Sequence, residues 1–166
     1  MRRADDIPVA HTPPGGWRTF PPPVLAGCEE PLVAGAPDLR GLWKAVDVMV
    51  NGERVDAHPI YRHVERIEQA GDRVVVTSTG VIHDMRCDGT VERGVDDVTT
   101  DFRTRIRVVA TFEDGAHVLR PVGMPGIEVT RRRDGVYVVW TYGPAFAARL
   151  ERIGGTDALP PTAAKR

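Results

Sequence analysis

His83 is the side chain in this sequence best placed for chemistry. It lies between Val81 and Met85 in a short apolar run, and in a strand these three side chains turn to one face. An imidazole titrates near neutral pH, so on an apolar face it can orient a ligand or move a proton. The same pattern also fits a core histidine that is bonded to a backbone carbonyl. His83 is therefore the candidate catalytic residue, and its structural alternative stays open.

Aromatic side chains supply the candidate ligand contacts. Trp140 and Tyr142 alternate along a late apolar run, where two rings on one face either line a flat or polyene ligand or fill a core. Small-molecule pockets are mostly apolar with a few placed polar groups, so rings of this kind predict a bulky hydrophobic ligand. Further candidates come from other expected inward faces and from the N-terminal segment: Met85, Tyr61, Phe102, Ile106, Trp17 and Phe20.

Metal and cofactor motifs do not stand out. His58 and His63 have no third ligand at useful spacing, whereas zinc takes three or four. The acidic stretch at Asp96, Asp97 and Asp101 lacks the glycine and terminal glutamate of a calcium loop, and we interpret it as a solvated turn. No Gly-x-Ser-x-Gly context, phosphate loop or dinucleotide fingerprint occurs. We therefore expect no metal and no cofactor.

Length and charge narrow the class of protein. A chain of 166 residues suits one domain, and 22 basic against 23 acidic residues give a net charge of -1. This balance argues against a nucleic-acid partner. No apolar run reaches the roughly 18 residues that a transmembrane helix needs, and residues 1–8 lack the apolar stretch of a signal peptide. We expect a cytoplasmic protein without a membrane partner, in which Cys28 and Cys87 are free thiols.

Alternating runs separated by turn residues fill residues 38–153. Asp-Gly steps between such runs are strong hairpin signals, and no stretch has a helical period. The pattern predicts an all-β antiparallel meander, either a sandwich or an up-and-down barrel. The expected strands are 42–50, 60–68, 73–79, 81–87, 90–98, 102–112, 117–122, 127–132, 136–142 and 145–153.

Prolines set residues 1–37 apart from the rest of the chain. Eight of the 14 prolines lie there, which excludes a helix or a central strand. Trp17 and Phe20 indicate that the segment packs against something. It fits a lid over an open barrel end, a permanent structural cap, or a contact to a neighbouring subunit of a homodimer. Residues 154–166 are small and polar, and we expect a flexible tail.

A Gly-x-Trp motif opens the first expected strand, at Gly41 and Trp43. With the meander and with Arg149 and Arg152 in the last strand, it resembles the calycin superfamily of lipocalins and fatty-acid-binding proteins. The resemblance covers residues 38–153 and implies an up-and-down β-barrel of about 8–10 strands, in which a large ring plugs the narrow end and a last-strand arginine packs over it.

Three departures separate this chain from its nearest calycin patterns. Residues 51–59 are too few for the two-helix lid of fatty-acid-binding proteins. Glu151 stands where those proteins have the tyrosine of a carboxylate-gripping Arg-x-Tyr, so capture of a fatty-acid head group by that motif is not expected. The last histidine is His117, too early for the haem ligand of nitrobindin-type barrels.

The resemblance implies two classes of function. Some bacterial lipocalin-like barrels are cofactor-free cyclases of natural-product pathways, including spirotetramate and spirotetronate [4+2] cyclases, which need mainly a shaped, dry cavity. The leading expectation is an enzyme of this kind that folds a hydrophobic substrate for cyclisation or isomerisation. The alternative is a carrier or sensor that binds a hydrophobic ligand unchanged, and a filled barrel that serves as an interaction module is a third reading.

Overall fold

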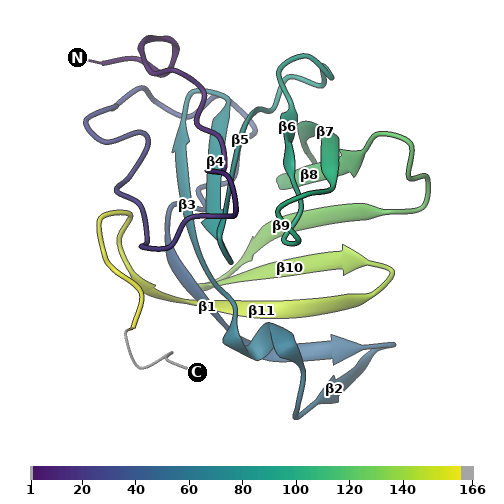
Figure 1. The fold of residues 1–166 in the computed structure, drawn as a ribbon. Coiled ribbons are helices and arrows are strands. Elements are labelled where there is room, and N and C mark those ends of the chain that lie inside the picture. The colour runs from purple at the N-terminus through teal and green to yellow at the C-terminus, as the bar shows by residue number, and fades with distance from the viewer. Residues whose placement is uncertain (1, 162–166) are drawn as a thin grey trace.

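The computed structural model describes residues 2–161, and nearly all of their regular structure is strand (Figure 1). Eleven strands and two short 3-10 helices follow one another along this part of the chain. Their bounds are η1 Ala4–Asp6, β1 Gly41–Val50, β2 Glu53–Val55, η2 Pro59–Arg62, β3 Val64–Ala70, β4 Arg73–Ser78, β5 Val81–Arg86, β6 Val95–Val98, β7 Arg105–Glu113, β8 Ala116–Pro121, β9 Glu128–Asp134, β10 Tyr137–Gly143 and β11 Phe146–Gly154.

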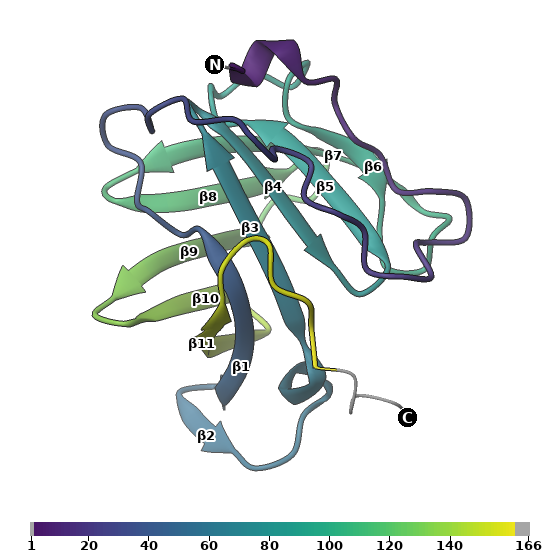
Figure 2. The same cartoon turned by 90° about the vertical axis from the view of Figure 1, so that its left-hand side faces the viewer.

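The strands form one antiparallel sheet that curls into a nearly closed barrel (Figures 1 and 2). Its order is β5-β4-β3-β1-β11-β10-β9-β8-β7-β6, with β2 paired to β1 outside this path. The two ends of the order meet at a seam between β5 and β6, where the Arg86 N–H donates to the Arg93 carbonyl at 2.8 Å and Asp88 bridges Thr111. The predicted all-β up-and-down architecture is confirmed.

The start of the second expected strand is wrong, because residues 59–62 form η2 instead. Pro59 suits the first turn of a helix, where its missing N–H is not needed. The His58 side chain caps this turn, with Nδ1 accepting a hydrogen bond from the Ile60 N–H at 3.1 Å. The short strand β2 before it was not predicted either.

The expected strands 90–98 and 102–112 are shorter than predicted. β6 begins at Val95 and β7 at Arg105, and Phe102 lies in the turn between them with φ at 61°. Asp101 holds this turn, since its Oδ1 accepts the N–H groups of Arg103 and Thr104, both at 2.8 Å. Phe102 is therefore not an inward-facing strand residue.

Trp43 plugs one end of the barrel. Its side chain is fully buried, and Nε1 donates to the Leu39 carbonyl at 2.9 Å. The guanidinium that lies over the ring belongs to Arg133 at the end of β9, 5.7 Å from the ring centroid, so the expected cover by a last-strand arginine is wrong. Arg152 lies instead beside Gly41, whose φ of 148° is a backbone conformation that side chains rarely adopt, and this explains the glycine of the motif.

Residues 2–40 run along the outer face of β3, β4 and β5 rather than across the open end opposite Trp43 (Figure 2). Gly16 and Trp17 reach that end, where the Trp17 N–H donates to the Gly80 carbonyl at 2.9 Å. A lid role for this segment stays a prediction. Apolar side chains of the segment and of the outer strand face form a second core: Ala4, Ile7, Leu25, Ala70, Val75 and Ile82, with Ala10, Trp17, Val24 and Cys28 at its edge.

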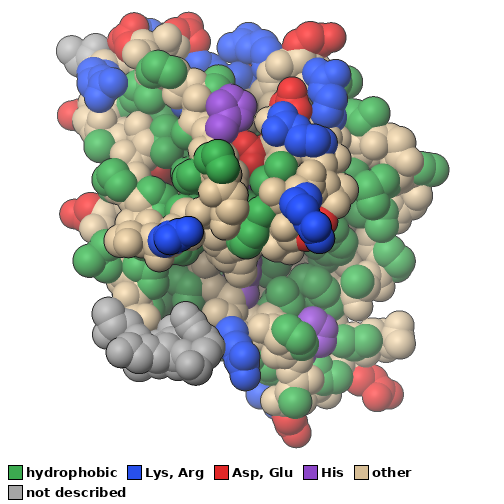
Figure 3. Space-filling view, in the orientation of Figure 1, with side chains coloured by type: hydrophobic (Ala, Val, Ile, Leu, Met, Phe, Trp, Pro, Cys, Tyr) green, Lys and Arg blue, Asp and Glu red, His purple; other side chains and the backbone are tan. Residues whose placement is uncertain are grey.

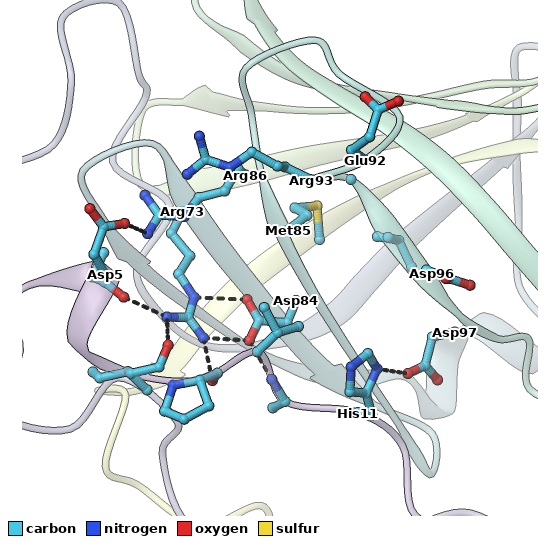
Figure 4. Close-up of a pocket in the computed structure, with 17 residues that line it drawn as sticks. Asp5, His11, Arg73, Asp84, Met85, Arg86, Glu92, Arg93, Asp96 and Asp97 are labelled. Carbon is cyan, nitrogen blue, oxygen red and sulfur yellow. Dashed lines mark hydrogen bonds and ion pairs between the residues drawn. The ribbon is translucent and has the colours of Figure 1, made fainter.

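Buried charges on the outer strand face bind the backbone of this segment. Arg73 forms a two-pronged ion pair with Asp84, at 2.9 and 2.6 Å, and donates to three carbonyls of residues 4–8 (Figure 4). Glu68 accepts the N–H groups of Val24 and Leu25 at 3.0 and 2.7 Å. A proline-rich segment has few partners of its own for these groups, so the strand side chains satisfy them.

Two further expectations concern the C-terminal tail and membrane-spanning helices. The expected tail begins inside the sheet, because Gly154 still belongs to β11, and its residues 162–166 lie outside the described part of the chain. No helix within residues 2–161 is long and apolar enough to cross a membrane.

Candidate functional site

A buried ion pair crosses the barrel interior next to the Trp43 plug. Glu65 of β3 accepts hydrogen bonds from Nε and Nη2 of Arg131 of β9, at 2.8 and 2.9 Å. Nε2 of His63 lies 2.7 Å from the same carboxylate. The three side chains are 0%, 6% and 7% exposed. β3 and β9 are not neighbours in the sheet, so this pair joins opposite walls with charge-assisted bonds.

Arg131 lies in a row of inward side chains on neighbouring strands. The strand register pairs it with Trp140 of β10 and with His117 of β8, and pairs His117 in turn with Phe112 of β7. The guanidinium carbon is 5.0 Å from the Trp140 ring centroid, and the His63 ring is 4.5 Å from it. The indole is thus held between a cation and an imidazole.

His117 and Trp140 bring polar atoms without partners into this row. His117 is 0% exposed and Trp140 is 7% exposed. Within residues 2–161, neither ring nitrogen of His117 nor Nε1 of Trp140 has a hydrogen-bond partner. A buried polar atom left unpaired costs about 1–3 kcal/mol. A polar group of a bound molecule would satisfy these atoms.

Electrostatics fix the protonation of this cluster. Burial alone would raise the pKa of Glu65, but the Arg131 charge and the His63 contact outweigh it and hold the pKa at about 2. Burial, and then the nearby Arg131 charge, lower the pKa of His117 to about 3. At neutral pH the carboxylate is therefore ionised and His117 is a neutral imidazole with one donor and one acceptor.

Because of His117, the free energy of unfolding is expected to decrease as the pH is lowered. The unfolded chain takes up this proton near pH 6.5, whereas the native chain does so only near pH 3. Acidification between these values therefore favours unfolding, by up to about 1.4 kcal/mol per pH unit for one group. We expect His117→Leu to be more stable than the parent protein, by a margin that widens as pH falls from 6.5 to 4.5 in denaturant titrations. A margin that is constant with pH would contradict the assignment.

The open end of the barrel is lined by apolar side chains that remain half-exposed. These residues pack against the interior core but are not buried, and they come from η2 and from the strand ends opposite Trp43. They therefore form an apolar rim around the polar row, referred to below as the rim. Its members are Val55, Ile60, Tyr61, Ile106, Leu119, Tyr142 and Phe146.

Aromatic rings lead from the rim to the polar row. Phe146 stacks on Tyr142 with centroids 5.6 Å apart and meets Trp140 edge to face at 5.1 Å. His58 lies 5.5 Å from Phe146 on the side of η2. A hydrophobic molecule that enters here would contact rings first and the unpartnered nitrogens last.

The structure places the sequence-predicted site residues in two groups. Trp140, Tyr142, Met85, Tyr61 and Ile106 all belong to the interior core or the rim. The remaining aromatic candidates do not lie in the interior. Phe102 packs against Gly16 and Gly80, and Trp17 meets Phe20 edge to face on the outer wall, with centroids 5.4 Å apart.

His83 joins the two sides of the seam. It lies on the same face of β5 as Met85, and its Nε2 is 2.8 Å from the Val98 carbonyl of β6. Burial lowers its pKa, against the opposing effect of that carbonyl. This is the carbonyl-bonded arrangement that the sequence left open beside a catalytic role.

Sequence reasoning missed most of the polar row. His117, Glu65 and Arg131 were not among the candidates, and His63 was considered only as a metal ligand; Phe146 of the rim was missed as well. The available signal was strand alternation. Arg131 is two positions from Val129, and Glu65 is two positions from Ile67, so each shares a strand face with a side chain that points to the interior. The acidic Asp97, expected in a solvated turn, is also buried, where it accepts the Thr12 N–H at 3.1 Å.

A concavity lies outside the barrel, over the seam. It is a groove of about 480 Å³ between the N-terminal segment, β5 and residues 92–97 (Figure 4). Its wall carries charges of both signs, including Arg73, Asp84 and Asp97, and Met85 and Val95 are the residues that it shares with the interior core. This lining suits a hydrophobic ligand less well than the rim does.

Comparisons with known proteins agree with this architecture. No protein-family model and no curated protein sequence matches the chain. Among solved structures, zebrafish ileal bile acid-binding protein, crystallised with cholic acid, is similar with a TM-score of 0.51 and 16% identity, over 69% of this chain and 98% of that one. At that identity the likeness concerns the fold, and it confirms that the chain folds as a calycin-like β-barrel.

Proposed function

We propose that the protein encloses a bulky hydrophobic small molecule in the open end of its barrel. The observation that carries this proposal is the pairing of a half-exposed apolar rim with buried, unpartnered nitrogens on His117 and Trp140. Small-molecule sites combine these two features, an apolar wall and a few placed polar groups. The solved structure of similar fold was crystallised with cholic acid, a steroid carboxylic acid, and its bulky skeleton, though not its carboxyl group, is of the kind proposed here.

The surface distribution of side chains supports this location. In Figure 3 hydrophobic side chains gather over the middle of the face, where β9 and β10 run in Figure 1. Charged side chains gather above them, near β5 and β6. On this face the apolar side chains therefore lie apart from the charged groove of the seam.

Phe146→Ala is expected to weaken binding of a hydrophobic probe at least tenfold. The ring contacts Tyr142, Trp140 and His58, so its loss removes the centre of the aromatic wall. Binding would be measured through tryptophan fluorescence and the shift of the melting temperature with a panel of steroids, polyenes and polyketide-like macrocycles. Val136→Ala, at a side chain 71% exposed between β9 and β10, is the matched control. A panel that shifts neither signal in the parent protein would refute the proposal.

The finer form of the proposal is a cofactor-free enzyme of the cytoplasm that folds its ligand for cyclisation or isomerisation. What supports it is a water-poor floor whose neutral donors can hold a substrate carbonyl while the rim fixes its conformer. The ionised, fully bonded Glu65 and the weakly basic His117 are poor proton carriers at neutral pH, so shape would do most of the catalysis. A proton-moving role for His83 would fall to Nδ1, since Nε2 is engaged by Val98.

The alternative is a carrier or sensor that releases the same ligand unchanged. Incubating the protein with each ligand that binds, then comparing masses and retention times with a protein-free sample, separates the two. A rate of conversion above the protein-free rate that Phe146→Ala lowers supports the enzyme. Bound ligand recovered unchanged from every incubation supports the carrier.

A further inference from the structure

We propose that the barrel selects ligands whose buried polar group is a neutral oxygen, such as a hydroxyl, ketone or ester, and excludes carboxylates. The inference rests on the proposed function and names the ligand class of the same site. The residues that carry it are Trp140 and His117, which offer hydrogen bonds to the ligand, and Glu65, which already neutralises the one interior guanidinium of the polar row.

Arg131 is the residue that would attract an anionic ligand, and its charge is already matched. Both of its described hydrogen bonds go to Glu65, in a side-by-side arrangement at 2.8 and 2.9 Å. A ligand carboxylate next to Arg131 would also lie next to this ionised carboxylate, and two like charges in a dry interior repel strongly. To displace Glu65 would leave a fully buried carboxylate without its main partner.

The free hydrogen-bonding groups suit a neutral ligand. Trp140 Nε1 is a donor only, and neutral His117 has one donor and one acceptor. A carbonyl can accept from either side chain, and a hydroxyl can both accept from the indole and donate to the imidazole. The two residues flank Arg131 on β10 and β8, so one polar floor presents donors on both sides of the internal ion pair.

The rim determines which hydrophobic skeleton the ligand can have. Tyr142 and Phe146 present stacked rings beside Trp140, and the other rim members are aliphatic or the half-buried Tyr61. These seven side chains are hydrophobic, so the part of the ligand that they contact is expected to be uncharged. The predicted ligand is a hydrophobic skeleton with one or two neutral oxygens at its leading end.

The test uses three molecules that share one skeleton: retinol, methyl retinoate and retinoic acid. Fluorescence titration at pH 7.5 is expected to give at least tenfold tighter binding for the alcohol and the ester than for the acid. If retinoic acid binds as tightly as retinol and methyl retinoate, or more tightly, the inference is overturned and the proposed function stands. If none of the three binds and the wider panel fails as well, both fall; if the panel yields another ligand, the same comparison is made between its acid and its ester, and the same criterion applies.

Variants of the polar row separate selection from mere loss of fold. Glu65→Gln frees the guanidinium and is expected to raise retinoic acid affinity at least tenfold. Should that variant not fold, the double variant Glu65→Met with Arg131→Met removes both charges and is expected to keep retinol binding. Trp140→Phe keeps a ring but loses the donor, and is expected to weaken retinol at least fivefold. Tyr137→Phe, on the same strand with its ring under Arg149, is the control and should leave all three affinities unchanged.

Discussion

Arg131→Met is expected to lower the free energy of unfolding by about 3 to 5 kcal/mol, which is the usual loss when one partner of a buried ion pair is removed. The variant leaves the carboxylate of Glu65 in the interior with only the His63 contact. Its pKa would then rise toward protonation, so the loss should be smaller at pH 4 than at pH 7. Urea unfolding followed by tryptophan fluorescence at the two pH values measures both effects.

An exposed pair of the same geometry provides the control. Arg40 makes the same two-pronged contact to Asp38, at 2.9 and 2.8 Å, but both side chains are about half exposed. Solvent screens such a pair, so Arg40→Met should cost less than about 1 kcal/mol. The double variant Glu65→Met with Arg131→Met should recover most of the loss, since it removes both buried charges. Equal losses for Arg131→Met and Arg40→Met would mean that the interior pair is hydrated, not dry.

The fold was predictable because its signals are local. Asp-Gly steps at residues 88–89, 114–115 and 134–135 mark turns, and the alternation between them fixes which side chains face inward. Trp43 as a plug followed from one motif. The errors arose where a capped turn replaced a strand, as at Pro59, or where one aspartate organised a turn, as at Asp101.

The polar row was not predictable by the same means. Charged side chains on a strand usually face water, so Arg131, within the run Thr130 to Arg133, resembles a surface residue. Its partner Glu65 is 66 positions away, and only closure of the barrel brings the two walls together. The spacing that places Arg131 on the same strand face as Val129 was the one local signal. That spacing alone does not distinguish a charge in the barrel interior from a strand that is polar on both faces.

The N-terminal segment shows a similar division between composition and location. Its apolar side chains predicted packing, which is observed. The surface that it covers was not predictable from the sequence. The outer face of β3 to β5 carries Arg66, Glu68, Arg73 and Asp84, which is the pattern of a solvent-exposed strand face. These charges are buried under a segment whose backbone they bind. Polar residues on a strand usually face solvent, whereas here they face a second layer.

Arg73→Met is expected to release residues 2–37 from the barrel wall and to cost about 3 to 5 kcal/mol. The guanidinium is 2% exposed, and it bonds Asp84 together with the carbonyls of Ala4, Ile7 and Pro8. Its loss leaves a buried carboxylate that keeps one described hydrogen bond, from the Ala10 N–H at 2.8 Å. The expected readouts are a lower urea midpoint and faster tryptic cleavage after the exposed Arg18 under native conditions.

The comparison of point variant and deletion decides what the segment does. Removal of residues 2–36 also strips the partners of Arg66 and Glu68 and uncovers Val75 and Ile82, so the truncated chain should unfold or aggregate. Arg3→Met, at a side chain 62% exposed, should leave both the midpoint and the cleavage rate unchanged. A truncated barrel that folds with parental stability and altered retinol affinity would show instead that the segment gates the site. Because buried charges of the outer wall bind the backbone of the segment, we expect the structural outcome.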